Sequence, residues 1–592
     1  MSKNRVSGRA PSGGRKSVAR LLEELQERKC VFDVGAEDEK SDLLKELAKR
    51  SFRDTEQLAC FHDLLCFMQA YPDSRDLLAQ VSDILESFHD RVDRFRAGAS
   101  AERFSELNGT GMVGTQICYP FSFHTAKWLA RHYPRDIVIN WDDFEELDVL
   151  CEWLPAMTSP FEGPSLEDME LDTDVWVKYA AEREGKNDFE WLMERMTHTG
   201  MPELGLEAFY ELLNLPIIWS LKPETASRTL ARVQLSKVVY QGTPLLKKEL
   251  NVLDVVRESL PSLERVSAAK GRKLIAEAIN MLSVRNREIY PLFVANPRDV
   301  IVIELERGFT LVLIGMKPTR RFSLETDYFF FGLKNNVPVT YGSSAICLDQ
   351  AEVAINIFSS FRQGESALLY TQVMRVFHQV FGVRAFLVEK FQIGGDDNDD
   401  ALQSGAFWFY HKLGFRPIDP EVAAFGEQES EKRTKRSGYR TSRRGLKKLA
   451  ESNMRLFVSG RSTVADKISL PGLGLLVSDY LGVNSSSLKS SRSKKMEAAV
   501  KEVCKLLEIR DLPRWSAGEK FWLREFSPLV VHIPRLEDWS RAERRDLAVL
   551  IKAKGQVSEV DYVLRWKRHD AFIKALCTLS RKGKRLRDRL IA

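Results

Sequence analysis

The spacing of hydrophobic residues predicts helices in the first half of the chain. Over residues 17–96 apolar side chains recur at helical intervals, as at Leu58, Phe61 and Leu65. Further helical segments are predicted at 122–132, 203–214, 224–240 and, as one long amphipathic stretch, 252–288. Residues 17–290 are therefore expected to form one or two mainly helical domains.

Near residue 296, short apolar runs separated by turn residues replace the helical spacing. Two strands and a turn are predicted over 299–314, followed by a hairpin with Lys334-Asn335-Asn336 at its turn. The next elements are predicted in the order strand, helix, strand, helix at residues 351–361, 364–381, 383–391 and 400–413, the last stopping at Gly414. This order predicts an α/β (α+β) domain with a mixed sheet over 295–425.

The C-terminal part is basic and then helical again. Residues 431–450 contain nine Lys or Arg and one acidic residue, and residues 484–495 are rich in Ser and Lys. A basic and Ser-rich linker region is predicted over 426–495, and a helical domain with a basic tail over 496–592. Residues 1–16, rich in Ser, Gly and basic side chains, are predicted to be a disordered tail.

Composition limits the class of protein. The 592 residues are 44% hydrophobic and 29% charged, which is ordinary for a soluble globular chain of about three or four domains. The net charge of +5 argues little about partners by itself. No run approaches the ~20 apolar residues of a membrane span, and the N-terminus lacks the apolar core of a secretory signal. A cytoplasmic protein without a membrane partner is expected.

Two patterns that could indicate a cofactor are weak. The eight cysteines form no C-x-x-C pair, so reduced thiols and no metal site are expected. Gly109-Thr-Gly111-Met-Val-Gly114 spells G-x-G-x-x-G, but a polar segment precedes it where a dinucleotide site needs a strand. A loop is predicted there.

The most specific motif lies in Gln403–Phe415, with the sequence QSGAFWFYHKLGF. It resembles the closing acetyl-CoA motif of the GNAT superfamily of N-acetyltransferases. In that family a helix carries Asn, then Ala three residues on and Tyr four further, followed by x-x-x-Gly-Phe. Ala406, Tyr410 and Gly414-Phe415 fall in this register, whereas Gln403 stands where Asn is usual.

The turn before the predicted helix 364–381 resembles the phosphate-binding turn of the same family, Gln/Arg-x-x-Gly-x-Gly/Ala. Here the turn reads Phe361-Arg362-Gln363-Gly364-Glu365-Ser366, in which only Gly364 matches strictly. Backbone N–H groups at a helix N-terminus lack intrahelical partners, and a glycine lets phosphate oxygens approach them closely. Glu365 is in conflict with this role, because its charge would repel a pyrophosphate unless it points away.

The resemblance implies acyl transfer from acetyl-CoA, or another acyl-CoA, to an amine of unknown identity. The CoA-binding residues that it implies are Arg362, Gln363, Gly364, Ser366, Gln403, Ala406 and Tyr410. The amine must lose a proton before it attacks, and the departing thiolate needs one, so by resemblance Tyr410 is the candidate acid. No motif fixes the base, for which Glu352 and Glu389 are the best carboxylates.

Two other functions remain open. The imperfect turn is also compatible with a non-catalytic protein that keeps a GNAT-like fold for binding or scaffolding. The basic segments Lys432–Lys448 and Arg581–Arg589 could instead contact nucleic acid or a protein partner, although a solvated surface is the alternative interpretation.

Overall fold

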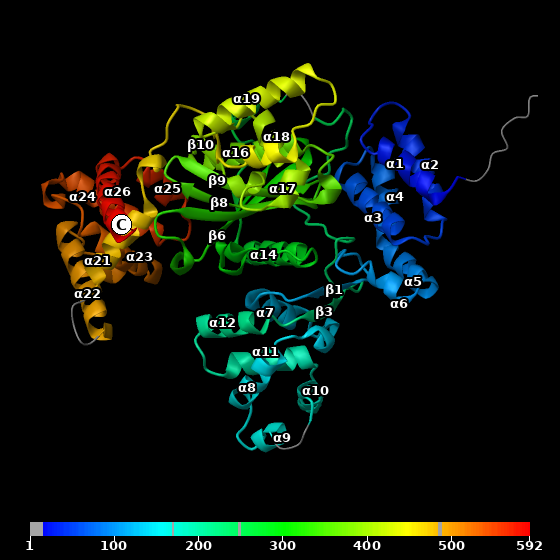
Figure 1. Cartoon of the computed structure of the whole chain (residues 1–592), viewed down its shortest axis with the longest axis horizontal. Helices are drawn as coiled ribbons and strands as arrows, with labels where there is room; N and C mark the ends of the chain where they lie inside the picture. Colours follow the sequence, from blue (N-terminus) through cyan, green and yellow to red (C-terminus); the bar gives the residue numbers. More distant parts are fainter. Residues whose placement is uncertain (1–15, 168–170, 247–249, 483–487, 592) are drawn as a thin grey trace, which may run out of the picture. The chain divides into compact units, whose positions relative to one another are not determined.

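The structure, a computed structural model, describes residues 16–167, 171–246, 250–482 and 488–591. These residues divide into two compact units (Figure 1). Unit 1 comprises Met1–Arg232, Val239–Leu245 and Asn280–Glu288, and unit 2 comprises Val233–Val238, Leu246–Ile279 and Ile289–Ala592. The predicted tail 1–16 lies outside the described residues, apart from its last residue.

Unit 1 begins with a group of helices. They are α1 (Val18–Arg28), α2 (Ala36–Ala48), α3 (Thr55–Ala70), α4 (Arg75–Glu86), α5 (Phe88–Gly98) and α6 (Ala101–Ser105). The side chains of Ser17, Asp54 and Ser74 accept N–H groups in the first turns of α1, α3 and α4, which satisfies donors that the helices leave free. The helices predicted over residues 17–96 are confirmed.

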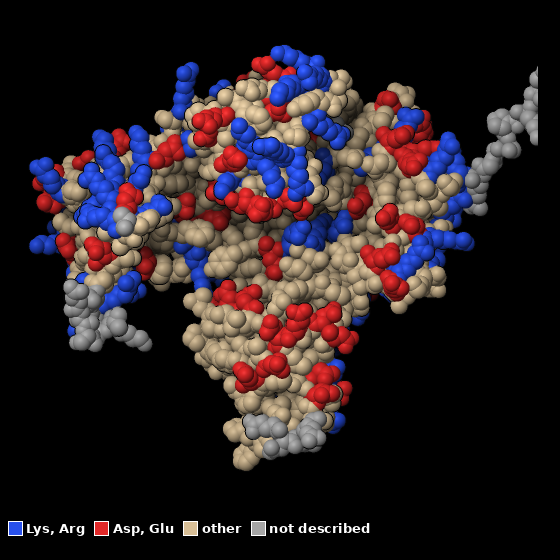
Figure 2. Space-filling model, in the orientation of Figure 1, with Lys and Arg blue, Asp and Glu red and all other residues tan. Residues whose placement is uncertain are grey.

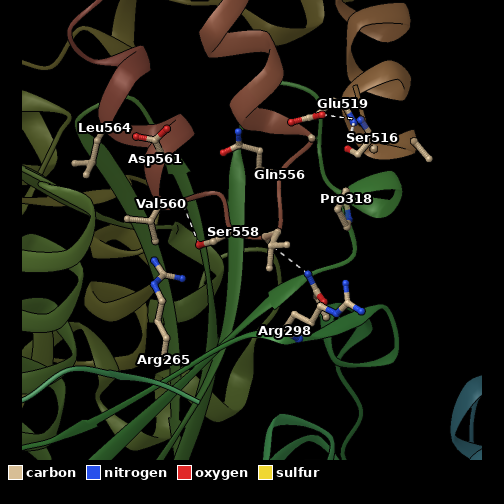
Figure 3. Close-up of a pocket in the computed structure, with 15 residues that line it drawn as sticks. Arg265, Arg298, Pro318, Ser516, Glu519, Gln556, Ser558, Val560, Asp561 and Leu564 are labelled. Atoms are coloured by element: carbon tan, nitrogen blue, oxygen red, sulfur yellow. Dashed lines mark hydrogen bonds between the residues drawn. The ribbon is translucent and has the colours of Figure 1, made fainter. Parts of the chain in front are cut away.

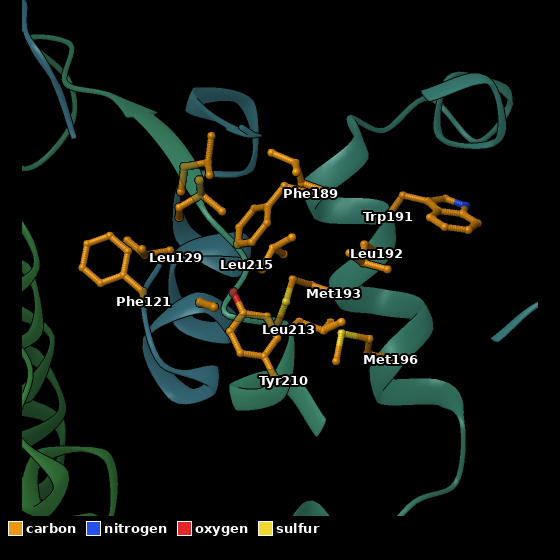
Figure 4. Close-up of a cluster of buried hydrophobic side chains, with 14 of the residues drawn as sticks. Phe121, Leu129, Phe189, Trp191, Leu192, Met193, Met196, Tyr210, Leu213 and Leu215 are labelled. Atoms are coloured by element: carbon orange, nitrogen blue, oxygen red, sulfur yellow. The ribbon is translucent and has the colours of Figure 1, made fainter. Parts of the chain in front are cut away.

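The rest of unit 1 packs helices against a small antiparallel sheet of order β1-β3-β2. The strands are β1 (Gln116–Tyr119), β2 (Ile137–Ile139) and β3 (Ile217–Ser220). The helices are α7 (Phe123–His132), α8 (Leu147–Met157), α9 (Gly163–Glu167), α10 (Thr173–Arg183), α11 (Asp188–His198) and α12 (Glu203–Leu213). Figure 4 shows their core, where Leu129, Phe189 and Tyr210 come together from α7, α11 and α12. The helices predicted at 122–132 and 203–214 are confirmed.

The helix predicted at 224–240 is wrong, because this segment forms no helix. Its backbone uses long-range partners instead. Val233 N–H donates to the carbonyl of Asn336 over 2.9 Å, and the N–H groups of Leu235 and Ser236 donate to the Asn336 side chain over 2.9 and 3.0 Å. Tertiary hydrogen bonds therefore replace the helical ones that the apolar spacing indicated.

The long amphipathic stretch predicted at 252–288 is interrupted. It forms α13 (Val252–Arg257), β4 (Glu264–Arg265) and α14 (Ala268–Ser283). Pro261 lies between α13 and β4, and proline can neither donate a helical hydrogen bond nor fit inside a helix without a clash.

Unit 2 contains a nine-stranded mixed sheet of order β11-β12-β10-β9-β8-β7-β6-β5-β4. The remaining strands are β5 (Ala295–Glu304), β6 (Phe309–Met316), β7 (Thr326–Lys334), β8 (Val337–Cys347), β9 (Gln350–Ile357), β10 (Ala385–Val388), β11 (Arg416–Pro417) and β12 (Met454–Phe457). Only β9 and β10 are parallel neighbours. Asn335 and Asn336 form the predicted hairpin turn with φ values of 49° and 68°. The mixed sheet between helical flanks is confirmed.

Several helices lie between strands of this sheet in the sequence. They are α15 (Tyr290–Phe293), α16 (Ser366–Phe381), α17 (Asp399–Ser404) and α18 (Ala406–Lys412). On one face of the sheet, Phe377 of α16 packs against Phe330 of β7 with ring centroids 5.9 Å apart. The helix predicted at 400–413 is divided in two because Gly405 adopts a left-handed conformation, with φ of 67°.

The linker predicted at 426–495 is wrong for its described residues through 482. That segment contains the end of α19 (Pro420–Lys435), then α20 (Arg443–Leu449), β12 and α21 (Leu470–Leu481). Met454 and Leu456 are buried in the sheet, while the neighbouring Lys and Arg side chains are mainly exposed. The sheet thus extends beyond the predicted limits 295–425 on both sides. Residues 483–487 of the predicted linker lie outside the described residues.

The C-terminal helices confirm the helical region predicted over 496–592. They are α22 (Leu488–Leu506), α23 (Ala517–Val530), α24 (Arg541–Lys554), α25 (Val560–Trp566) and α26 (Asp570–Ile591). A buried ion pair joins them to the segment between β6 and β7, since Glu559 lies 3.3 Å from Arg321, and Glu559 also lies 2.6 Å from Lys554 of α24. Every helix in the described part of the chain is too short or too polar to cross a bilayer.

Candidate functional site

The parallel strands β9 and β10 are paired only where both begin. The first three residues of β9 pair with the first three of β10, and the last pair is Glu352 with Leu387. Beyond this pair β9 continues to Ile357, whereas β10 ends one residue later at Val388. Glu352 and the next residue after β10, Glu389, therefore lie where the ladder between the two strands ends.

Several carboxylates influence one another around Glu352. The register across β7, β8 and β9 places Asp327 and Glu352 in one row, so both side chains project from the same face of the sheet. Burial, together with the negative charges of Glu389 and Glu325, raises the pKa of Glu352 to about 7. Burial also raises the pKa of Asp327 to about 7. Carboxyl groups with pKa values near 7 can exchange protons near neutral pH.

One amide connects Glu352 to Tyr410. Gln392 lies in the 3-10 turn η6 (Lys390–Ile393) that follows β10. Its Oε1 accepts a hydrogen bond from the Tyr410 hydroxyl over 3.3 Å, and its side chain is near enough to the Glu352 carboxylate to offset a small part of the rise in the pKa of that group. The predicted acid and one of the two predicted bases are thus brought together through a residue that the sequence did not indicate.

Tyr410 is held rigidly on the sheet side of α18. Its side chain is only 4% exposed, and its ring makes edge-on contacts with Tyr370 and Phe415 at centroid distances of 5.5 and 5.7 Å. Burial raises the pKa of Tyr410 above its usual range. The phenol therefore keeps its proton at neutral pH and can act as a donor.

A cavity of about 920 Å³ and one of about 900 Å³ occur in unit 2, and the second lies beside α18. We call the second the α18 cavity. It is lined by Leu246, Leu250, Val252, Arg362, Gln363, Gly364, Ser366, Ala367, Ser404, Gly405, Trp408, Phe409, Lys412, Leu413 and Arg433. These residues come from the start of α16, from α17 and α18, from α19 and from the segment before α13.

The α18 cavity is positively charged. Arg362, Lys412 and Arg433 line it, and among the described residues no carboxylate does. The first turn of α16 adds N–H groups without intrahelical partners and the positive end of the helix dipole. The guanidinium of Arg433 lies 4.5 Å from the centre of the Trp408 ring, which fixes a flat cationic surface at the wall. Such a cavity suits an anion that carries a flat ring.

Glu365 was expected to repel a phosphate at the turn, but its carboxylate is paired with cations inside the protein. Its carboxylate is fully buried, 2.9 Å from Lys334 Nζ and 2.8 Å from Arg307, and it also accepts the Leu246 N–H over 3.1 Å. Burial alone would raise the pKa of Glu365, but the ion pair with Lys334 lowers it below the usual value. The charge is thus neutralised inside the protein, away from the α18 cavity.

The predicted CoA-binding residues divide into two groups. Arg362, Gln363, Gly364 and Ser366 line the α18 cavity. Gln403, Ala406 and Tyr410 do not: Gln403 is exposed, Ala406 is half-buried, and Tyr410 reaches the other side of α18. Two wall residues, Lys412 and Arg433, were not predicted to bind CoA. Lys412 lies in the motif two residues after Tyr410, and Arg433 lies in the basic segment for which another role was considered.

The other large cavity of unit 2 has polar groups that already serve the fold (Figure 3). Arg265 is 3.4 Å from the buried Asp299, and Asn296 donates to the Val557 carbonyl over 3.0 Å. Glu519 and Ser516 cap α23 reciprocally. None of the predicted site residues lines this cavity, so the α18 cavity is the stronger candidate.

In the described part of the chain, no three His, Cys, Asp or Glu side chains lie close enough together to hold a metal ion. The cysteines in that part are free thiols. The segment 109–114 is a loop between α6 and β1, without the preceding strand of a dinucleotide site.

Comparison with known proteins returns no relative. No family model matches the chain, and no curated protein and no solved structure matches it either.

Proposed function

We propose that this chain is an acyl-CoA-dependent N-acyltransferase that resembles the GNAT superfamily in its central region. The observation that carries the proposal is the link from Glu352 through Gln392 to Tyr410, next to a cationic cavity. The order of β9, a turn, α16, parallel β10 and α18 supports it, because the resemblance implies the same order.

The α18 cavity would hold the nucleotide part of CoA. Its three cations match the charges of a diphosphate and a further phosphate, and arginine can bind phosphate through two parallel hydrogen bonds. Trp408 and Phe409 offer aromatic surface for a purine ring. The thioester end would then extend past α18 towards the end of the β9–β10 ladder.

At that end, Glu352 would take a proton from the ammonium form of the acceptor. The freed nitrogen lone pair attacks the thioester carbonyl carbon, so a C–N bond forms and a tetrahedral intermediate results. Its collapse breaks the C–S bond, and the thiolate leaves with the electron pair. The Tyr410 hydroxyl, oriented by Gln392, supplies a hydrogen bond and a proton to that sulfur. As the amide forms, its nitrogen gives up the remaining extra proton to solvent, the Tyr410 phenolate takes a proton back from solvent, and Glu352 returns its own proton to solvent, so that one proton is released overall.

The proposal is tested by incubating the purified full chain with acetyl-CoA and a panel of primary amines, including lysine peptides and small diamines. Release of free CoA thiol that depends on the amine, together with an acylated product by mass spectrometry, is the expected result. Binding of acetyl-CoA without amine-dependent thiol release for any amine would favour the alternative, a non-catalytic GNAT-like binding protein. Absence of binding would overturn both.

A further inference from the structure

The helices α19 and α20 form a basic surface that acyl transfer does not explain. Residues 431–450 hold nine Lys or Arg, and eight of these side chains are exposed. We call residues 432–448 the basic hairpin. Its two helices pack together, with Lys448 Nζ 4.7 Å from the centre of the Phe425 ring. Figure 2 shows Lys and Arg gathered at the end of α19.

Part of this charge is neutralised within the protein. Lys432 lies 2.7 Å from Glu429, Lys435 2.9 Å from Glu431, and Arg443 2.7 Å from Asp399. Of the other exposed cations, Lys448 lies over the Phe425 ring, whereas Arg436, Arg440, Arg444 and Lys447 form no ion pair with a described residue. These four, the unpaired cations, are available to an external anion.

Helix stability does not account for the unpaired cations. Basic side chains at the end of α19 complement the negative end of its dipole, but Arg443 and Arg444 occupy the first turn of α20, where the dipole is positive. Arg443 is compensated by Asp399, whereas Arg444 is not. Like charges so close together also repel one another. A ligand with several negative charges would offset both the unfavourable position of Arg444 at the positive end of the α20 dipole and the repulsion among neighbouring cations.

The surface favours a nucleic acid over a lipid bilayer. Helices that bind membranes insert an apolar face, but none of the exposed large hydrophobic residues lies between residues 420 and 450. Five of the nine basic residues are arginines, whose flat guanidinium groups bind phosphates and stack on bases. α20 has only seven residues and packs on α19, so it cannot enter a duplex groove as a recognition helix does. An unpaired strand, whose bases are free to stack, fits better.

We propose that the basic hairpin binds the phosphate backbone of a single-stranded nucleic acid. Contacts to phosphates give affinity without sequence preference, and each neutralised phosphate makes binding weaker as salt rises. The inference is independent of the acyl-transfer proposal, since none of the unpaired cations lines the α18 cavity.

The test measures fluorescence anisotropy of a labelled oligouridylate of about 20 nucleotides with the full chain at about 50 and 200 mM salt. One variant carries Arg436→Gln, Arg440→Gln, Arg444→Gln and Lys447→Gln together. A matched control removes four exposed charges from α26 through Lys584→Gln, Arg585→Gln, Arg587→Gln and Arg589→Gln. The hairpin variant should bind at least about 10-fold more weakly and with a shallower salt slope, whereas the control should bind nearly like the parent.

Four results would overturn the proposal: equal losses in both variants, no binding by the parent, equal affinity for a blunt duplex, or preference for anionic vesicles over the oligonucleotide. A parallel titration with an oligothymidylate shows whether RNA or DNA supplies the single strand. Melting temperature and the rate of acyl transfer are recorded for both variants. Unchanged values assign a lost RNA signal to the surface rather than to misfolding.

Discussion

The two sides of α18 carry opposite charge. On one side Lys412 joins Arg362 and Arg433 around a cavity whose described lining residues include no carboxylate. On the other side Tyr410 reaches Gln392 and, through it, Glu352, whose pKa of about 7 reflects burial and neighbouring negative charge. One short helix thus lies between a cavity lined by cations and a group of carboxylates.

This difference matches the two substrates of acyl transfer. An acyl-CoA has a polyanionic nucleotide and an uncharged thioester, whereas an amine arrives as a cation. Fields of opposite sign would draw each substrate to its own side and keep the nucleotide phosphates away from the general base. The two sides therefore predict separable effects: variants on the acidic side should change turnover, and variants on the cationic side should change affinity for acyl-CoA.

The largest effect is expected for Glu352→Gln. Loss of the base should lower turnover by about 10²–10⁴-fold, with unchanged affinity for acetyl-CoA by calorimetry. Asp327→Asn is the matched control, because Asp327 lies in the same row and has a similar pKa but is not linked to Tyr410. Equal losses in both variants would show that the whole carboxylate cluster, and not Glu352, is needed.

Tyr410→Phe should have the next largest effect. Only the hydroxyl is lost, so packing is kept, and turnover should fall by about 10–100-fold, since a thiolate with a pKa of about 8.5 leaves fairly readily without help. Tyr370→Phe serves as control, because the Tyr370 hydroxyl donates only to the Val353 carbonyl over 3.4 Å. Steady-state rates and melting temperatures are compared. If Tyr410→Phe turns over acetyl-CoA as fast as the parent, Tyr410 is not the acid, and its ring serves only to pack the core.

A smaller effect is expected on the cationic side. Lys412→Ala removes a charged wall residue and should weaken acetyl-CoA binding by about 10-fold, the usual order for a hydrogen bond to a charged group. Saturated turnover should stay close to that of the parent. Lys435→Ala, whose charge is paired with Glu431 outside the cavity, should change neither quantity. Calorimetry and saturation kinetics distinguish the two; unaltered affinity in Lys412→Ala would remove the cavity from the acyl-CoA site.

The smallest effect concerns pH. Glu352 acts as a base only when ionised, so kcat/KM should rise with pH through about 7 and then level off. Glu389→Gln removes a repelling negative charge, which lowers the pKa of Glu352 and should move this rise to lower pH by less than about one unit. The pH–rate profiles of both proteins measure the shift, and a move to higher pH would contradict the assigned coupling.

Local patterns in the sequence predicted much of the sheet, but not its full extent. The alternation of short apolar runs and the Asn335-Asn336 turn indicated β5 to β8, because turn chemistry and strand burial are local properties. β12 was missed because the basic residues around it hid a short alternation of Met454 and Leu456. Gly405 divided a helix whose apolar spacing is continuous.

The candidate site was predictable only in part. The turn 361–366 and Tyr410 follow from motifs within one segment. Gln392 carries no motif, and its role comes from the fold, which brings η6 between β9 and α18. Arg433 belongs to a segment read as a linker, and only the packing of α19 near α18 makes it a wall of the cavity. Contacts between segments distant in sequence leave no local signal.

Titration of the full chain with acetyl-CoA in a calorimeter tests the central claim most directly. If the cationic side of α18 holds the nucleotide of acyl-CoA, binding should saturate at one molecule per chain and weaken as salt rises, because the contacts are largely ionic. Acetyl phosphate, which lacks the nucleotide, should not compete with acetyl-CoA for the α18 cavity. Absence of a binding signal at low salt, or binding equally strong in a variant that lacks Arg362, Lys412 and Arg433 together, would contradict the account.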